Sequence, residues 1–377
     1  MDLGFSEEQN MLRTSALKFL EKECPKTLVR EMEKDEKGYS PELWRKMVEL
    51  GWMGLIIPEE YGGIGGDFLD LTVLLEEMGR ALLPGPFFST LLLGALPILM
   101  AGTGEQKKGF LTRIANGEII LTLALTEVSN RQDADGIEVM AVAEGEDYVI
   151  TGTKLFVPYA HISDYMVCVT RIKDGASPEK EITLFLVDSK SPGISCTVLK
   201  TIAADKQCEV VFNNVKVPKK NMLGERGEAW EVLQRITQQA AVADCALMVG
   251  GAQQVLEMSV SYAKERVQFN RPIGSFQAIQ HKCANMATDV DGAKYITYQA
   301  AWKISEGLPY AMEVSMAKAW VNEAYRRTCV EGHQIHGGIG FTKEHDMELY
   351  FRRAKAMEIA FGDADYHREL VARQLGL

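Results

Sequence analysis

The sequence predicts an α+β fold with three domains in chain order: an N-terminal helical domain at residues 1–118, a middle β-barrel or β-sandwich domain at residues 119–228, and a C-terminal four-helix bundle at residues 229–377. Two changes of hydrophobic period predict this order. The period is helical in the first block, alternates over short runs in the second, and is helical again in the third. Long helical runs joined by short turns favour an antiparallel bundle for the last block.

The N-terminal block contains several helix signals. Ser6 and Gln9 have the spacing of a capping box, so a helix is expected to begin after Ser6. A second helix is expected at Pro41, because proline suits the first position of a helix. Residues 69–83 form a third helical pattern. The apolar run at 91–101 is too short to cross a bilayer, and we interpret it as a buried core helix.

The middle block consists of short β-type runs separated by glycine, proline and acidic turn residues. Such spacing is typical of a compact sandwich or barrel. The runs are at residues 148–150, 154–157, 165–170, 182–187 and 209–212. The last block then has three long helical patterns, at residues 230–268, 279–305 and 310–335.

The composition argues against several kinds of partner. A net charge of -11 argues against nucleic acid and against an anionic membrane surface, because both repel an acidic protein. Seven scattered cysteines without a C-x-x-C pair suit reduced thiols in the cytoplasm better than a disulfide framework or a zinc site. The acidic, polar N-terminus argues against a targeting peptide, and no apolar run reaches the length of a membrane span.

Several segments carry a resemblance to a known family. They include the run Arg266-Val267-Gln268-Phe269-Asn270-Arg271-Pro272-Ile273 and, about sixty residues later, Gln334-Ile335-His336-Gly337-Gly338. In their order and spacing the segments resemble the acyl-CoA dehydrogenase family over essentially the whole chain. The segments are 58–63, 215–224, 266–273, 276–280 and 334–341. Two further segments, at residues 84–90 and 361–363, resemble those of family members that act on steroid side chains, dicarboxylic acids and alicyclic acids.

The chemistry of these residues suits a flavin dinucleotide. Arg266 offers a fixed fork of donors for pyrophosphate oxygens, and Gln334 can donate to a phosphate. Gly337 and Gly338 allow the backbone to approach a ligand closely.

The resemblance implies that the cofactor is FAD and that the site is shared between subunits. Arg266, Phe269 and Gln277 would come from one subunit, and Gln334, Gly337 and Gly338 from a neighbour. The flavin ring would lie against the middle domain. The residues there are Leu123, Leu125, Thr126, Phe156, Val157 and Pro158.

The resemblance also implies a reaction, in which a carboxylate takes the α-proton of a thioester while the β-hydrogen leaves as hydride. The family's usual glutamate falls on Phe361, which cannot accept a proton. A second family position falls on Ala240. Asp244 shares the helix face of Ala240, one turn away, and is the first candidate base. The alternative role of Asp244 is structural, as a side chain bonded to a neighbouring helix or to solvent. Asp363 is the second candidate.

Two other departures concern the cofactor motifs. The family's T-E-P-G-A-G-S-D loop is T-E-V-S-N-R-Q-D at residues 126–133, so Thr126, Glu127 and Asp133 remain while the glycines are lost. Asn270 also replaces a glycine beside Arg266. We therefore expect a reshaped loop.

Three functions remain open. The first is an oxidoreductase acting on a bulky, branched or cyclic acyl-CoA, with electron-transferring flavoprotein as acceptor and a homotetrameric assembly. The second is a non-catalytic, FAD-sharing subunit of a heterotetramer with a homologous chain. The third is an oxidase or monooxygenase on the same fold. His333 and His336 lack a nearby cysteine or carboxylate cluster, so no metal site is expected.

Overall fold

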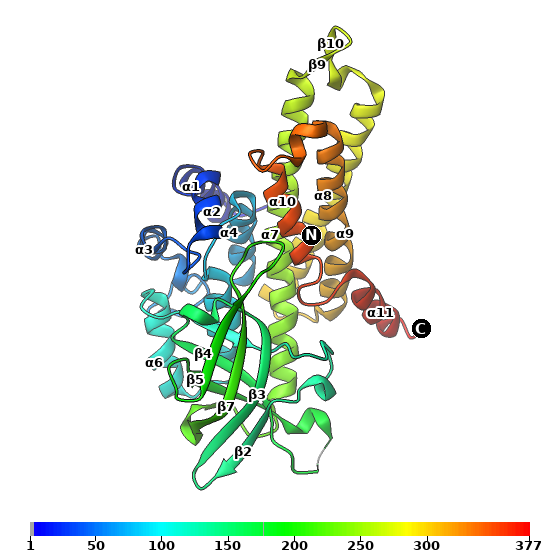
Figure 1. The fold of residues 1–377 in the computed structure, drawn as a ribbon. Helices are drawn as coiled ribbons and strands as arrows, with labels where there is room; N and C mark the ends of the chain where they lie inside the picture. The colour runs from blue at the N-terminus through cyan, green and yellow to red at the C-terminus, as the bar shows by residue number, and fades with distance from the viewer. Residues whose placement is uncertain (1–3, 176) are drawn as a thin grey trace. The chain divides into compact units, whose positions relative to one another are not determined.

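The computed structural model describes residues 4–175 and 177–377 (Figure 1). Helices come first, strands follow, and helices return, which confirms the predicted α+β class. By contacts the chain divides into two compact units. The bundle unit holds the described residues up to 30, residues 67–83 and residues 238–377, and the sheet unit holds residues 31–66 and 84–237. The domain boundaries at 118/119 and 228/229 stay predictions.

Helix α1 (Glu7–Glu23) of the bundle unit begins where the predicted capping box places it. Ser6 and Gln9 bond each other's backbone N–H, both at 3.1 Å. Helix α4 (Phe68–Ala81) has a similar reciprocal cap from Asp67 and Asp70. Helix α2 is Lys26–Lys34 and extends past the end of this unit at residue 30.

The long C-terminal helices also lie close to their predicted ranges, and α8, α10 and α11 all contact α9. Two glycines, Gly79 and Gly250, bring α4 against α7 backbone to backbone. A Cβ atom on Gly250 would lie 1.7 Å from the carbonyl oxygen of Glu76. These helices are α7 (Ala229–Glu265), α8 (Gln277–Ser305), α9 (Ala311–His336), α10 (Met347–Met357) and α11 (Ala364–Gln374).

The helices of the sheet unit include α3 (Pro41–Glu49), which starts at the predicted proline, and α6 (Gly104–Ala115). The apolar run at 91–101 is helical, as predicted. It begins as a π-helix at Ser89–Ala95 and continues as α5 (Leu96–Ala101), and most of its side chains are buried.

One sheet of eight strands forms the core of this unit, in the order β6-β7-β3-β2-β4-β5-β8, with β1 parallel to β4. The two runs predicted at 148–150 and 154–157 are one strand, β3, with irregularities near Gly152 and Phe156. The strands are β1 (Leu121–Ala124), β2 (Met140–Glu144), β3 (Asp147–Pro158), β4 (Tyr165–Arg171), β5 (Ile182–Asp188), β6 (Ile194–Leu199), β7 (Gln207–Pro218) and β8 (Met222–Leu223).

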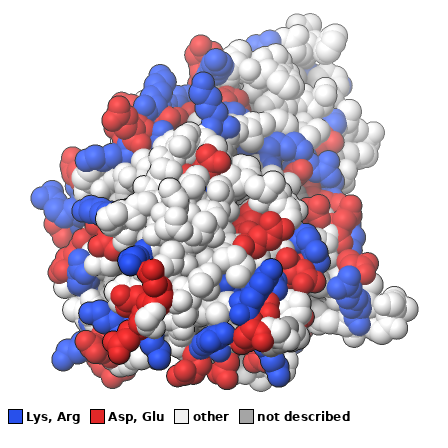
Figure 2. Space-filling model, turned by 60° about the horizontal axis from the view of Figure 1, so that its bottom comes forward, with Lys and Arg blue, Asp and Glu red and all other residues white. Residues whose placement is uncertain are grey.

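Charges of both signs lie on the surface of the molecule (Figure 2). On the face seen in Figure 2, lysines and arginines are interspersed with aspartates and glutamates, and no continuous basic surface covers it. Across the described residues, no helix combines the length and the apolar character that a membrane span requires.

Candidate flavin and acyl-CoA site

The end of β1 and the bulge of β3 bring the predicted flavin-facing residues of the sheet unit together. The backbone N–H of Leu155 donates to the carbonyl of Thr126 at 2.8 Å. The Lys154 ammonium donates to the carbonyl of Leu125 at 3.0 Å. Leu123 and Val157 are buried, while Leu125, Thr126 and Pro158 are half-buried.

Phe156 has an unusual backbone conformation for a bulky residue. Its φ is +51°, in the left-handed region, and its ring is 56% exposed. Such a conformation costs on the order of 1–2 kcal/mol in a residue other than glycine. Strained backbone of this kind concentrates at ligand sites. The geometry of the β3 bulge therefore agrees with a ligand-facing role for Phe156.

Glu127 fixes the reshaped loop without the missing glycines. Its carboxylate lies 2.6 Å from the buried Lys154 ammonium. It also accepts the backbone N–H groups of Glu138, at 2.9 Å, and Val139, at 3.2 Å. Burial lowers the pKa of Lys154, and Glu127 is one of the groups that oppose this shift. At the far end of the loop Asp133 caps a short turn by accepting from the Gly136 N–H at 3.0 Å.

In the bundle unit, the Arg266 motif forms a small hairpin after α7, with β9 (Val267–Gln268) paired to β10 (Arg271–Pro272). The two turn residues, Phe269 and Asn270, have φ of 52° and 63°. A two-residue hairpin turn of this type needs positive φ at both positions, and asparagine tolerates it better than most residues. Asn270 therefore replaces the glycine without loss of the turn. The ring of Phe269 is 86% exposed.

The polar side chains predicted to bind the cofactor are available. Arg266, Gln277 and Gln334 are exposed, and their side chains form no hydrogen bond or ion pair with the residues that the structure describes. A Cβ atom on Gly337 or Gly338 would meet nothing within 4 Å. Free donors beside open backbone fit a pyrophosphate, so these residues fit FAD.

The ends of α7 and α9 lie side by side in one chain. Tyr262, in the last turn of α7, stacks on His336 at the end of α9, with ring centroids 4.6 Å apart. Exposed apolar side chains follow both helix ends, which is typical of a surface that a ligand or a subunit covers. They are Val267, Phe269, Ile339 and Phe341.

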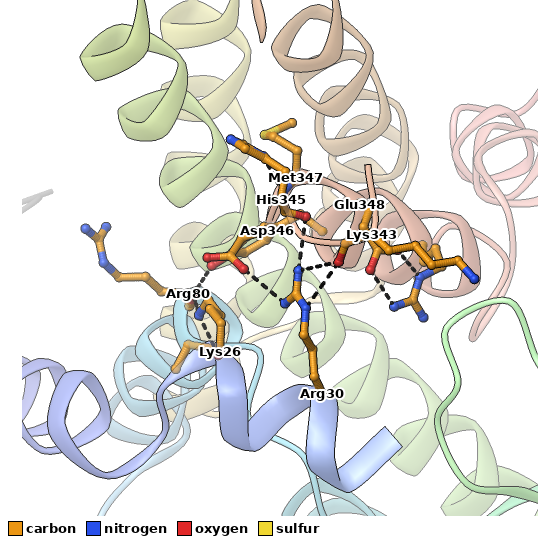
Figure 3. Close-up of polar contacts among 11 residues, drawn as sticks. Lys26, Arg30, Arg80, Lys343, His345, Asp346, Met347 and Glu348 are labelled. Carbon is orange, nitrogen blue, oxygen red and sulfur yellow. Dashed lines mark hydrogen bonds and ion pairs between the residues drawn. The ribbon is translucent and has the colours of Figure 1, made fainter. Parts of the chain in front are cut away.

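The loop after Gly338 is held by a residue that the sequence analysis missed (Figure 3). The Arg30 guanidinium donates to the carbonyls of Lys343, at 3.0 Å, and His345, at 3.1 Å, and forms an ion pair with Asp346 at 3.0 Å. Arg30 is one cation among several on α1 and α2, so no local pattern distinguishes it. Its partners are more than 300 residues away along the chain.

Phe361, at the position of the family's glutamate, is held by backbone contacts. Its φ is +55°, and its carbonyl lies 2.9 Å from His367 Nε2. The neighbouring Gly362 carbonyl accepts a hydrogen bond from Asn322 at 3.3 Å. The turn is thus well positioned, but the Phe361 side chain supplies no base.

Asp244 is buried and paired. Its side chain lies 2.5 Å from the Lys318 ammonium, and Asp244 is only 4% exposed. Lys318 also donates to the Met357 carbonyl at 2.9 Å. Burial raises the pKa of Asp244, and Lys318 opposes that rise. Asp363, by contrast, is exposed and caps α11 by accepting the Tyr366 N–H at 2.8 Å. The catalytic roles of both acids stay predictions.

His333 and His336 are bonded to their own helix. Their Nδ1 atoms lie 2.9 Å and 2.8 Å from the carbonyls of Cys329 and Gly332. Among the described side chains, no group of three or more histidine, cysteine, aspartate or glutamate residues is arranged to hold a metal ion.

Comparison with known proteins identifies the family. Models of the N-terminal, middle and C-terminal domains of acyl-CoA dehydrogenase match residues 6–118, 122–215 and 227–376, in that order. The chain belongs to the acyl-CoA dehydrogenase family. Members of this family are FAD-dependent flavoproteins, so the predictions of an oxidoreductase and of FAD as cofactor are confirmed.

Individual relatives cover the whole chain. Probable acyl-CoA dehydrogenase YngJ of Bacillus subtilis is 34% identical, over 100% of both chains. Caffeyl-CoA reductase-Etf complex subunit CarC of Acetobacterium woodii is 33% identical, over 98% of this chain and 99% of its own. The solved structure of butyryl-CoA dehydrogenase from Megasphaera elsdenii superposes with a TM-score of 0.93 at 29% identity, over 100% of both chains.

Proposed function

We propose that this chain is a catalytic acyl-CoA dehydrogenase that removes hydrogens from Cα and Cβ of a bulky, branched or cyclic acyl-CoA. The observation that carries the proposal is the set of free polar side chains at Arg266, Gln277 and Gln334, on a chain that the family matches from end to end. FAD, when bound, supplies a hydride acceptor for the β-carbon. Arg266 and Gln334 would hold its pyrophosphate, and Phe156 would lie against its ring.

Asp244 is the base that we favour. Catalysis requires it to be ionised, and the Lys318 ammonium at 2.5 Å stabilises the ionised form despite complete burial. The surrounding face of α7 is lined by the small buried residues Ala240, Ala241 and Ala243. We expect these small side chains to accommodate a larger acyl group than bulky residues would. The relative named caffeyl-CoA reductase suggests that aromatic acyl groups be tested.

The proposed partners are an electron-transfer protein and further copies of this chain. The relative from A. woodii is named as part of an Etf complex, which supports electron-transferring flavoprotein as a partner. If the chain dehydrogenates its substrate, this partner would be the electron acceptor. We propose a homotetramer. The full-length relatives carry enzyme names, and this does not favour a non-catalytic subunit. A cytoplasmic location agrees with seven free cysteines.

The first experiment tests the function as a whole. The chain is expressed alone, its flavin spectrum is recorded, and straight-chain, branched, cyclic and aryl acyl-CoAs are added with an artificial electron acceptor. We expect bound flavin that bleaches, and the largest kcat/KM with a bulky acyl group. Flavin that binds only with a co-expressed homologue would establish the subunit alternative instead.

The second experiment isolates the base. Exchange of the substrate α-proton with deuterated water is followed in Asp244→Asn, with Asp363→Asn as the matched control. We expect exchange to fall at least about a hundredfold in the first variant and to stay within about twofold in the second. Because Asp244→Asn leaves Lys318 buried without a counter-charge, the double variant Asp244→Asn/Lys318→Gln is measured too. Wild-type exchange in a folded, FAD-loaded double variant would remove Asp244 from the mechanism.

A further inference from the structure

Two cysteines lie diagonally across from each other on neighbouring strands of the sheet unit. Cys196 in β6 is opposite Val210 of β7, and Cys208 in β7 is opposite Val198 of β6. Residues two positions apart on a strand point to the same face, so both thiols lie on one side of the sheet. Diagonal neighbours of this kind are within reach of each other.

A histidine completes the cluster. Nδ1 of His161 lies 3.6 Å from the Cys208 sulfur, and its Nε2 lies 3.0 Å from the carbonyl oxygen of Glu36. Since a carbonyl only accepts hydrogen bonds, Nε2 carries a hydrogen and Nδ1 is available for the Cys208 proton. The ring is stacked on Tyr159, which fixes its plane.

The two thiols share a proton unequally. A hydrogen bond with Cys196, assisted by His161, lowers the pKa of Cys208, while the same bond raises the pKa of Cys196. Cys208 is fully buried and Cys196 is exposed. The cluster therefore shares a proton between a buried sulfur and a sulfur that solvent can reach. A thiolate is the form that attacks another sulfur atom.

We propose that Cys196 and Cys208 form a reversible disulfide when the protein meets a hydroperoxide. The Cys196 proton shifts to Cys208 along the hydrogen bond between the two thiols, and the Cys196 sulfur attacks the peroxide oxygen. The O–O bond breaks, the leaving oxygen takes the proton from Cys208 and departs as an alcohol or as water, and Cys196 becomes a sulfenic acid. The Cys208 thiolate then attacks the Cys196 sulfur, and hydroxide leaves with a proton from His161. Two thiols and one peroxide thus give one disulfide, one water and one alcohol or second water.

The position of β6 permits this closure. Diagonal Cα atoms in a sheet are about 7–8 Å apart, and a disulfide prefers less than about 6.8 Å, so the strands must approach slightly. Among the strands that the structure describes, β6 is at the edge of the sheet and pairs only with β7, and its side chains are mostly exposed. An edge strand is paired on one side only, so a small shift of β6 breaks no hydrogen bonds to a second strand.

Peptide mapping tests the proposal without any measurement of catalysis. Purified protein is treated with hydrogen peroxide, blocked with N-ethylmaleimide and digested without reductant. We expect a linked pair of peptides that contains Cys196 and Cys208. Its mass should be two hydrogen atoms less than the sum of the two free peptides, and dithiothreitol should separate it. In Cys208→Ser, Cys196 should instead accumulate as a sulfenic acid that dimedone labels.

The controls separate this pair from ordinary thiol oxidation. Cys283, partly exposed on α8, serves as the reference thiol, and Cys283→Ser should leave the linkage unchanged. His161→Gln should slow disulfide formation at least about tenfold, because the leaving hydroxide loses its proton donor. If Cys196 and Cys283 are oxidised at equal rates, or if Cys196 passes to sulfinic acid without a linked peptide, the proposal is wrong.

Discussion

Buried charged side chains in this protein are stabilised by specific partners and not by contact with water. Lys154 and Lys318 are both completely buried, and each is matched by a carboxylate and a backbone carbonyl. Removing one member of such a pair leaves an uncompensated charge and typically costs about 3–5 kcal/mol. The sequence shows the acids Glu127 and Asp244 but cannot show their partners, because 27 and 74 residues separate them from the lysines.

His367 is a buried residue with a measurable pH effect. Burial lowers its pKa from 6.5 to about 4, and the nearby Lys318 adds to this shift, while the Phe361 carbonyl and Asp363 oppose it. The unfolded chain therefore binds the proton first. The neutral ring contributes stability that is complete above pH 6.5 and is lost as the pH falls toward 4, by at most about 3 kcal/mol.

We predict that His367→Gln flattens the dependence of stability on pH between 6.5 and 4. Glutamine can still donate to the Phe361 carbonyl but does not titrate. Urea denaturation midpoints at several pH values measure the slope. His281→Gln, at an exposed position on α8, is the control and should leave the wild-type slope. An unchanged slope in His367→Gln would assign the acid sensitivity to other groups.

At the scale of elements, the close crossing of α4 and α7 depends on glycine. A Cβ atom on Gly250 would overlap the carbonyl of Glu76, and one on Gly79 would lie 2.0 Å from the carbonyl of Leu247. Both obstacles are backbone atoms, so the helices must separate to accept a side chain.

We predict that Gly250→Ala destabilises the protein by about 1–3 kcal/mol or more. The matched control is Gly109→Ala in α6, where a Cβ atom would meet nothing within 4 Å. There the helical preference of alanine should stabilise the folded protein by about 0.5–1 kcal/mol. Thermal denaturation of both variants gives the comparison. Equal and small effects would mean that α4 and α7 tolerate a wider separation.

The ends of helices could be predicted where a local sequence signal sets them. The pairing of strands could not be predicted. Ser6, Pro41 and the glycines after residue 336 end or begin helices through their own chemistry, so the helix ranges were correct within a few residues. The bulges of β3 depend on the register with β7, which is a long-range property. The sequence therefore showed two strands where there is one.

At the scale of the whole molecule, the family resemblance predicted the cofactor correctly but left the base open. The FAD motifs keep their residue types, so they can be read from the sequence. Neither Phe361 nor Ala240, at the two positions of the family's base, can accept a proton, so a base in this chain would be another group that the fold brings to the substrate. Which group serves as the base depends on tertiary contacts and on the position of the substrate, and sequence spacing reveals neither.

We predict that Arg266 and Gln334 of different subunits bind one FAD. Arg266→Ala and Gln334→Ala should each lose most of their flavin. When both variants are co-expressed, a mixed pair has one site with both changes and one site with none, so flavin content should recover. Absorbance per subunit measures it, with co-expression of two tagged Arg266→Ala chains as the control. No recovery in mixed assemblies would mean that a single subunit supplies both residues.

The contacts between Arg30 and the loop after Gly338 have a consequence for folding during translation. The ribosome adds Arg30 early, yet the carbonyls that it binds, at Lys343 and His345, follow more than 300 residues later. The helices of the N-terminal half can form during translation, since segments begin to fold as they leave the ribosome. The loop beyond Gly338 must wait until residue 345 has been added, so a nascent chain that stalls before residue 343 lacks the contacts with Arg30 that hold this loop.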